Sequence, residues 1–194
     1  MKTALGQELE NSRKEFCFRV GVFCALFALL FGGGSMLWGC QSADETTPVL
    51  LPLSHSYDSP EALAKAFLDA LNRKDVDGLK RLGLSEEEFR LHVWPELPVS
   101  QLDKPLPFEY GWNDLNQKSM NSLRRTYTTY GGRKLTFIRL EFEGETTDYE
   151  TFKVHRDGRV VVFDEERQRE VRLDLFGSIM EKDGRFKLFS YVTD

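Results

Sequence analysis

The sequence predicts an α+β domain whose N-terminal helices pack on a bent antiparallel sheet in a cone-like arrangement. Three observations predict this class. Apolar residues recur at helical spacing over residues 59–130, they alternate with a period of two from residue 134 onward, and Asp-Gly pairs separate the alternating segments. Helices followed by an antiparallel meander are typical of α+β folds, in which the helices cover one face of the sheet.

Length and composition indicate a single folded domain without cysteine chemistry. Of 194 residues 41% are hydrophobic, enough for one core after an exported segment is subtracted. The net charge of −5 argues against nucleic acid as a partner. All three cysteines lie at or before residue 40, so the folded part has neither a disulfide nor a thiolate metal site.

Capping residues mark where the first three helices begin. Ser59 caps the first helix, with Pro60 in its first turn, where the missing N–H costs nothing. Asp75 caps a short second helix. Ser85 and Glu88 form the capping box of the third helix.

Proline and glycine mark where the later helices end. Pro95 is expected to end the third helix, and a Pro-bearing connection follows over residues 96–112. A fourth helix is expected over residues 114–130, because Gly131-Gly132 closes an apolar pattern of helical spacing.

Alternating segments after residue 134 predict the strands. In the first of them, Ile138, Leu140 and Phe142 share one face. Asp157-Gly158 predicts a tight hairpin that leads into a central apolar strand, and Gly177 predicts a bulge where a long strand bends. The expected strands cover residues 134–143, 150–156, 160–163 and 171–175, with a last strand after Asp183-Gly184.

The N-terminus has the layout of a secretory signal. Basic residues precede an apolar run over residues 20–31, and a Gly-rich break follows it. Leu37, Gly39 and Cys40 resemble a bacterial lipobox, although bulky Trp38 departs from the usual small residue. The resemblance implies that a peptidase cuts before Cys40 and that a lipid on Cys40 holds the protein on a membrane. An uncleaved signal anchor is the alternative.

The predicted organisation is a signal over residues 1–39, a flexible tether over residues 40–58 and a domain over residues 59–194. Both interpretations of the signal place residues 41–194 outside the cytoplasm, since the basic residues precede the apolar run. The expected location is the bacterial cell envelope, on its periplasmic or outer-surface side. Gln41 resembles the residue at this position in lipoproteins that travel to an outer membrane.

The order of elements over residues 59–194 resembles the nuclear transport factor 2-like, or SnoaL-like, superfamily. The resemblance rests on the opening pair SPEALAKAFLDALNRKDVDGLKRL, on the break from Asn72 to Asp75, and on the closing hairpin DGRFKLFSYVTD. It implies a cone whose bent sheet wraps the helices around a pocket. Because the superfamily contains isomerases, dehydratases and non-enzymatic binding modules, the fold alone does not fix a function.

Two sets of residues are candidates for a site. His155 and Asp174 are the acid–base candidates, but strand alternation puts both on the polar face of the sheet. His92 adjoins the apolar face of the third helix, which favours a structural role. The three histidines lack a ligand spacing, so neither a metal nor a cofactor is expected.

Aromatic residues form the second set. Trp94, Tyr110, Trp112 and Tyr191 either line a pocket for a small apolar ligand or only pack in the core. An exposed sheet face could instead support a homodimer. The sequence therefore favours a membrane-anchored, non-catalytic module that binds a ligand or a protein, with a small isomerase- or dehydratase-like enzyme as the alternative.

Overall fold

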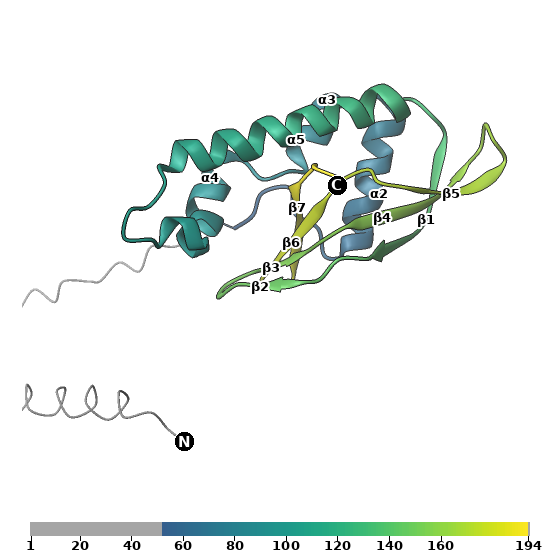
Figure 1. The fold of residues 1–194 in the computed structure, drawn as a ribbon. Coiled ribbons are helices and arrows are strands. Elements are labelled where there is room, and N and C mark those ends of the chain that lie inside the picture. Colours follow the sequence, from purple (N-terminus) through teal and green to yellow (C-terminus); the bar gives the residue numbers. More distant parts are fainter. Residues whose placement is uncertain (1–51, 194) are drawn as a thin grey trace, which may run out of the picture. The chain divides into compact units, whose positions relative to one another are not determined.

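The computed structural model describes residues 52–193 (Figure 1). The predicted signal, the lipobox and Cys40 lie outside the described residues. Within the described residues, no helix is both long enough and apolar enough to cross a membrane.

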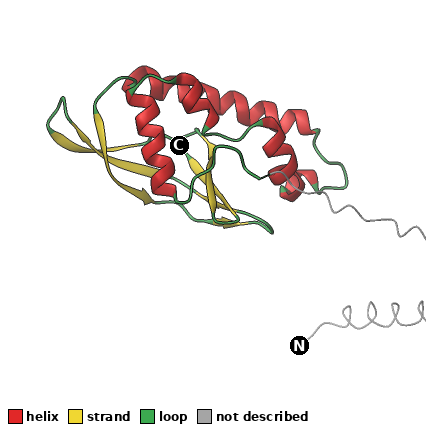
Figure 2. Cartoon of the chain, turned by 180° about the vertical axis from the view of Figure 1, so that it is seen from behind, coloured by secondary structure: helices red, strands yellow, loops and turns green. Residues whose placement is uncertain are grey.

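Helices come first in the chain and antiparallel strands follow, which confirms the α+β class. Figures 1 and 2 show α5 running along one side of the strands. The helices are α2 (Pro60–Asn72), α3 (Val76–Arg81), α4 (Glu86–Glu88) and α5 (Phe108–Tyr130), with the short turns η1 (Phe89–Val93), η2 (Trp94–Glu96) and η3 (Pro98–Ser100) between α4 and α5.

The predicted helix caps are confirmed. The Ser59 hydroxyl accepts from the backbone N–H of Ala62 at 3.0 Å, and the Asp75 carboxylate accepts from that of Gly78 at 2.7 Å. Ser85 and Glu88 form both bonds of the capping box.

Two helix boundaries differ from the prediction. Pro95 does not end the third helix, because the chain continues through the π turn η1 into η2. Helix α5 begins at Phe108, six residues before the predicted start at residue 114, so the supposed connection 96–112 contributes its first turn. Gly111 lies in that turn against the Trp94 ring, where a Cβ would come within 2.3 Å of a ring carbon.

The strands form two antiparallel sheets where the sequence predicted one bent sheet. One sheet has the order β1-β4-β5 and the other the order β2-β3-β6-β7. The strands are β1 (Leu135–Phe142), β2 (Thr147–Asp148), β3 (Lys153–His155), β4 (Gly158–Asp164), β5 (Arg169–Leu173), β6 (Ser178–Lys182) and β7 (Arg185–Ser190).

Gly177 lies where the chain passes from one sheet to the other. Its carbonyl accepts from the N–H of Gly158 at 3.1 Å, and its own N–H donates to the carbonyl of Ser190 at 3.1 Å. A Cβ at Gly177 would lie 1.7 Å from the carbonyl oxygen of Val192, so only glycine fits. The break between β5 and β6 therefore takes the place of the predicted bend in one long strand.

The hairpin predicted at Asp157-Gly158 is wrong. Asp157 has the positive φ of 53° that suits a tight turn, but β3 pairs with β6 while β4 pairs with β1. The turn therefore connects two sheets. The apolar run after it does form a central strand, because β4 lies between β1 and β5.

A β-bulge in β1 changes which residues face the core. The register shifts between Phe137 and Arg139, so Ile138 is the extra residue and is 41% exposed. Leu140 still packs against the core, whereas Phe142 is exposed. The predicted common face is therefore wrong at Ile138, which the bulge removes from the side of the strand on which Leu140 packs against the core.

Buried apolar residues form two clusters. The larger one joins α2 and α3 to both sheets and includes Phe67, Leu71, Val160, Leu188 and Tyr191. The smaller one lies beneath η1 and contains Phe89, Val93, Phe108, Phe152, Val154 and Met180. The second cluster joins the start of α5 to strands β3 and β6.

Candidate functional site

A pocket of about 400 Å³ lies next to the smaller cluster. Four segments that are far apart in the sequence form this pocket. They are the chain before α2, the π turn η1, the loop before β3, and the turn between β6 and β7. Its lining residues are Pro52, Leu53, His92, Thr151, Lys182, Asp183 and Arg185. This volume lies in the usual range of small-ligand pockets, about 300–1,000 Å³.

His92 is the most unusual residue of this lining. It lies on the π turn, where the N–H of Trp94 reaches the carbonyl of Phe89. Only 4% of His92 is exposed, and its ring nitrogen Nδ1 has no hydrogen-bond partner among residues 52–193. Buried polar atoms nearly always have a partner, and π turns occur often at functional sites. Both features set His92 apart from an ordinary core residue.

Lys182 is the second buried polar residue of the pocket. It is 8% exposed, and its ammonium group donates to the Thr151 hydroxyl at 2.7 Å and to the Thr151 carbonyl at 3.3 Å. The same hydroxyl donates to the Glu96 carboxylate at 2.5 Å. Lys182 thus holds the loop before β3. The Thr151 hydroxyl lies between the Lys182 ammonium group and the Glu96 carboxylate, which form no direct ion pair.

The chain that forms the pocket wall is fixed by a buried ion pair. Lys187, which is 1% exposed, contacts the Glu88 carboxylate at 2.8 Å and donates to the carbonyl of Ser54 at 2.7 Å. Glu88 also accepts from the N–H and the hydroxyl of Ser54, both at 2.8 Å. Residues 52–58 of the predicted tether are therefore held against the domain.

Hydrogen bonding and burial act in opposite directions on this pair. Burial alone would raise the pKa of Glu88, but hydrogen bonds from Lys187 and the Ser85 backbone outweigh it and hold the pKa below its ordinary value of 4.5. Burial lowers the pKa of Lys187, and Glu88 offsets this only in part. The carboxylate is the better stabilised partner, because it accepts from several donors.

The four predicted aromatic residues do not meet in one place. Trp94 and Trp112 both lie against Phe89, with ring centroids 6.1 and 5.6 Å away. Tyr110 is 64% exposed on the first turn of α5. Tyr191 is buried in the larger cluster, and its hydroxyl donates to the carbonyl of Leu79.

Trp112 and Tyr191 do line one narrow space between α3, α5 and β7. Its volume is about 20 Å³, which is room for roughly one water molecule. Side chains therefore leave no room for an organic ligand between these elements.

The two acid–base candidates lie apart, one in a strand of the β2-β3-β6-β7 sheet and the other just after a strand of the β1-β4-β5 sheet. His155 in β3 contacts the Glu181 carboxylate through Nε2 at 2.8 Å and the Thr146 hydroxyl through Nδ1 at 3.1 Å. Asp174 follows β5 and pairs with Arg159 at 3.0 Å. The structure therefore gives each of them a partner of its own.

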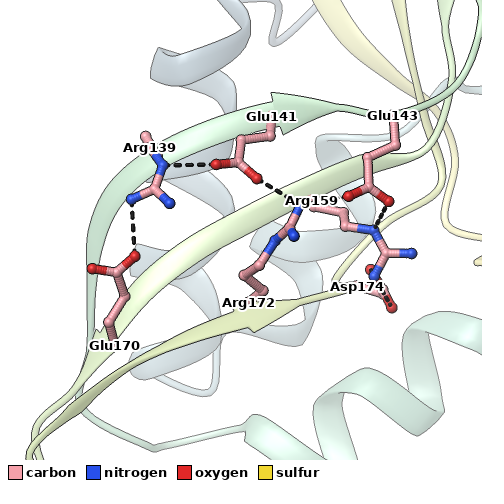
Figure 3. A network of polar contacts seen from close by, with 7 residues as sticks. All are labelled: Arg139, Glu141, Glu143, Arg159, Glu170, Arg172 and Asp174. Atoms are coloured by element: carbon pink, nitrogen blue, oxygen red, sulfur yellow. Dashed lines mark hydrogen bonds and ion pairs between the residues drawn. The ribbon is translucent and has the colours of Figure 1, made fainter.

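The outer face of the β1-β4-β5 sheet carries a ladder of alternating charges (Figure 3). Arg139 contacts Glu141 at 2.7 Å and Glu170 at 2.9 Å, and Arg172 contacts Glu141 at 2.7 Å. Hydrogen bonding from Arg139 lowers the pKa of Glu141. The members of the ladder are Arg139, Glu141, Glu143, Arg159, Glu170, Arg172 and Asp174.

A second pocket of about 190 Å³ lies at one end of this ladder. Glu143, Asp157 and Asp174 line it, but Arg159 neutralises two of these carboxylates through ion pairs. Among residues 52–193, no group of three or more potential ligands could hold a metal ion. The seven charges of the ladder are all paired with one another.

The pocket beside His92 contains residues that the sequence analysis missed. Thr151 and Lys182 were not candidates, and His92 was assigned a structural role. One feature of the sequence could have indicated this pocket. Lys182 lies two residues after buried Met180 in β6 and is itself buried, so a lysine occupies an inward position of this strand.

Comparisons with known proteins add no assignment. The chain matches no family model, no curated protein and no solved structure.

Proposed function

We propose that this chain is an exported lipoprotein, held on the bacterial envelope by a lipid on Cys40, whose domain binds a small ligand without catalysis. The single observation that supports binding is the pocket beside His92, a lining residue whose buried ring nitrogen Nδ1 lacks a hydrogen-bond partner among residues 52–193. A ligand that supplies this partner would remove the cost of leaving the nitrogen unsatisfied.

Binding is favoured over acid–base catalysis because no hydrogen bond from residues 52–193 orients Nδ1 of the His92 imidazole. A catalytic base is usually held in place by a third group that bonds its other side. Within residues 52–193, Nδ1 of His92 has no such partner. The His155–Glu181 pair is oriented, but His155 lines none of the pockets discussed above.

A homodimer is the alternative form of binding. Cores of protein interfaces are depleted of charged residues. The outer face of the β1-β4-β5 sheet carries the charge ladder, so this face is a poor candidate for an apolar dimer contact. We therefore place the binding role in the pocket.

The nuclear transport factor 2-like relationship is part of the proposal. Helices α2 and α5 precede the antiparallel strands, as the resemblance requires. The ligand, however, is assigned to the pocket beside His92, since the space lined by Trp112 and Tyr191 has room for only about one water.

Palmitate labelling of cells that express the full chain tests the anchor. Wild type should incorporate the label and Cys40→Ala should not, because only a thiol at the lipobox position accepts the lipid. Cys24→Ala removes a cysteine from within the apolar run and serves as the matched control, which should label like wild type. Equal labelling of Cys40→Ala and wild type would reject the anchor.

Native mass spectrometry of the full chain, extracted from membranes in mild detergent, tests the binding role. Wild type should carry a non-covalent adduct in addition to its covalent lipid. His92→Phe should lose the adduct, whereas His55→Phe, which changes a histidine outside this pocket, should retain it. A wild-type spectrum that contains the bare chain alone would contradict the binding role.

A further inference from the structure

We infer that the ligand of the pocket beside His92 carries an anionic group on an apolar body, and that Lys182 binds the anionic group. This inference rests on the proposed function and names its ligand class. It follows from a contrast between two buried lysines on neighbouring strands.

The contrast concerns how each buried charge is balanced. Lys187 in β7 contacts the Glu88 carboxylate at 2.8 Å. Lys182 in β6 has no ion-pair partner among residues 52–193, and its two acceptors both belong to Thr151. Buried charges are normally paired, because removal from water is costly. An anion in the pocket would balance Lys182 as Glu88 balances Lys187.

The geometry leaves Lys182 a donor for this anion. An ammonium group has three N–H donors, and Thr151 accepts at two positions. Glu96 bonds the hydroxyl and the backbone N–H of Thr151 at 2.5 to 3.2 Å, so its carboxylate is directed at Thr151. The third donor of Lys182 is therefore available to a ligand.

The other charges of the lining do not replace the missing partner. Arg185 is already engaged, through an ion pair with Asp58 and hydrogen bonds to Ser56. Asp183 is exposed in the β6–β7 turn, where water screens its charge. Lys182 is thus the lining charge that is both buried and without a direct ion-pair partner among the described residues, since the Glu96 carboxylate reaches it only through the Thr151 hydroxyl.

The apolar part of the pocket lining indicates what the uncharged part of the ligand is. Pro52 and Leu53 contribute apolar surface, and the volume of about 400 Å³ is far larger than one small inorganic anion needs. Apolar walls with a few placed polar groups are typical of sites for organic ligands. The class that fits is a small organic acid.

Three probes separate the charge of the ligand from its body. Benzoate has both features, benzyl alcohol has the apolar ring without the charge, and inorganic phosphate has the charge without the ring. Each is titrated into the full chain in phosphatidylcholine nanodiscs, with empty nanodiscs as the blank. Binding is followed by the ring ¹H–¹⁵N signals of His92, which report occupancy of this pocket.

Benzoate should bind at least roughly tenfold more tightly than benzyl alcohol or phosphate, since a charge-assisted hydrogen bond forms only with benzoate in an apolar site. Lys182→Met should remove this preference and still bind benzyl alcohol, which also shows that the variant is folded. Lys182→Arg should retain the preference. Lys153→Met, which removes an exposed lysine from the neighbouring strand β3, should behave like wild type.

Two results would overturn the account at different points. If benzyl alcohol binds as tightly as benzoate and Lys182→Met changes neither affinity, the anionic class is wrong while the binding role stands. If none of the three probes shifts the His92 signals, the proposed binding role itself fails.

Discussion

Replacement of Glu88 by methionine should be the most destabilising change on the surface that joins residues 52–58 to the domain. The substitution leaves the Lys187 ammonium buried with only the carbonyl and hydroxyl of Ser54 as acceptors, at 2.7 and 3.2 Å. Removal of one partner of a buried ion pair costs about 3–5 kcal/mol. The N–H of Ser85 also loses its acceptor in the capping box.

The assay is urea unfolding of the full chain, followed by tryptophan fluorescence. In a parallel thermal unfolding experiment, about 3–5 kcal/mol corresponds to a fall in Tm of roughly 10–20 °C for a domain of this size. The double variant Glu88→Met/Lys187→Met should cost less than the sum of the two single variants, because it leaves no unpaired charge. Glu86→Met, which removes an exposed partner of Arg90, is the matched control and should cost under about 1 kcal/mol.

Two outcomes would refute this reasoning. A cost for Glu88→Met no larger than that of Glu86→Met would mean that the pair is not buried in solution. Strict additivity in the double variant would mean that Glu88 and Lys187 do not interact.

Further predictions concern pH, backbone packing and the charge ladder. Because the folded-state pKa of Glu88 is lowered from 4.5, the carboxylate stabilises the fold above about pH 4.5. This contribution is lost as the pH falls through the folded-state pKa. The difference in unfolding free energy between wild type and Glu88→Gln should therefore shrink in this acidic range. Gly177→Ala should lower the Tm by roughly 10 °C or more, since its Cβ would overlap the Val192 carbonyl. Gly184→Ala should cost only about 1 kcal/mol, because Gly184 has a φ of 70° but open space around it. Equal costs of the two variants in calorimetry would contradict this. Arg172→Met should lower the unfolding free energy by at most about 1 kcal/mol in denaturant titrations, and by less at high salt, because the ladder is exposed. A large loss that salt does not change would contradict this.

Local features of the fold could be predicted from the sequence. Ser59, Asp75, and the pair Ser85 and Glu88 cap helices as expected, because a cap depends on residues only three positions apart. The turn at Asp183-Gly184 also forms as expected, with φ of 52° and 70° at the two residues.

Long-range features could not be predicted in the same way. The separation into two sheets depends on which strands pair, and β3 joins β6 across more than twenty residues. The bulge at Ile138 leaves no mark in the alternating pattern, so Ile138 was wrongly assigned to the inward face of β1, whereas Leu140 after the bulge packs against the core as predicted.

The candidate site was missed for a related reason. Its lining comes from four separate segments, and the capping residue Glu88 meets Lys187 only in the folded chain, 99 positions away. A lone histidine beside an apolar helix face gives no sign that its ring nitrogen will lack a partner. The inward-facing Lys182 was the one local signal, and it becomes informative only when the unpaired charge is seen in three dimensions.

The most direct measurement is a crystal structure of the chain purified from cell membranes without added ligand. We expect non-protein density in the pocket beside His92, with an acceptor atom within hydrogen-bond distance of Lys182 Nζ. A pocket closed by protein side chains, or one that contains only water around Lys182, would contradict the account.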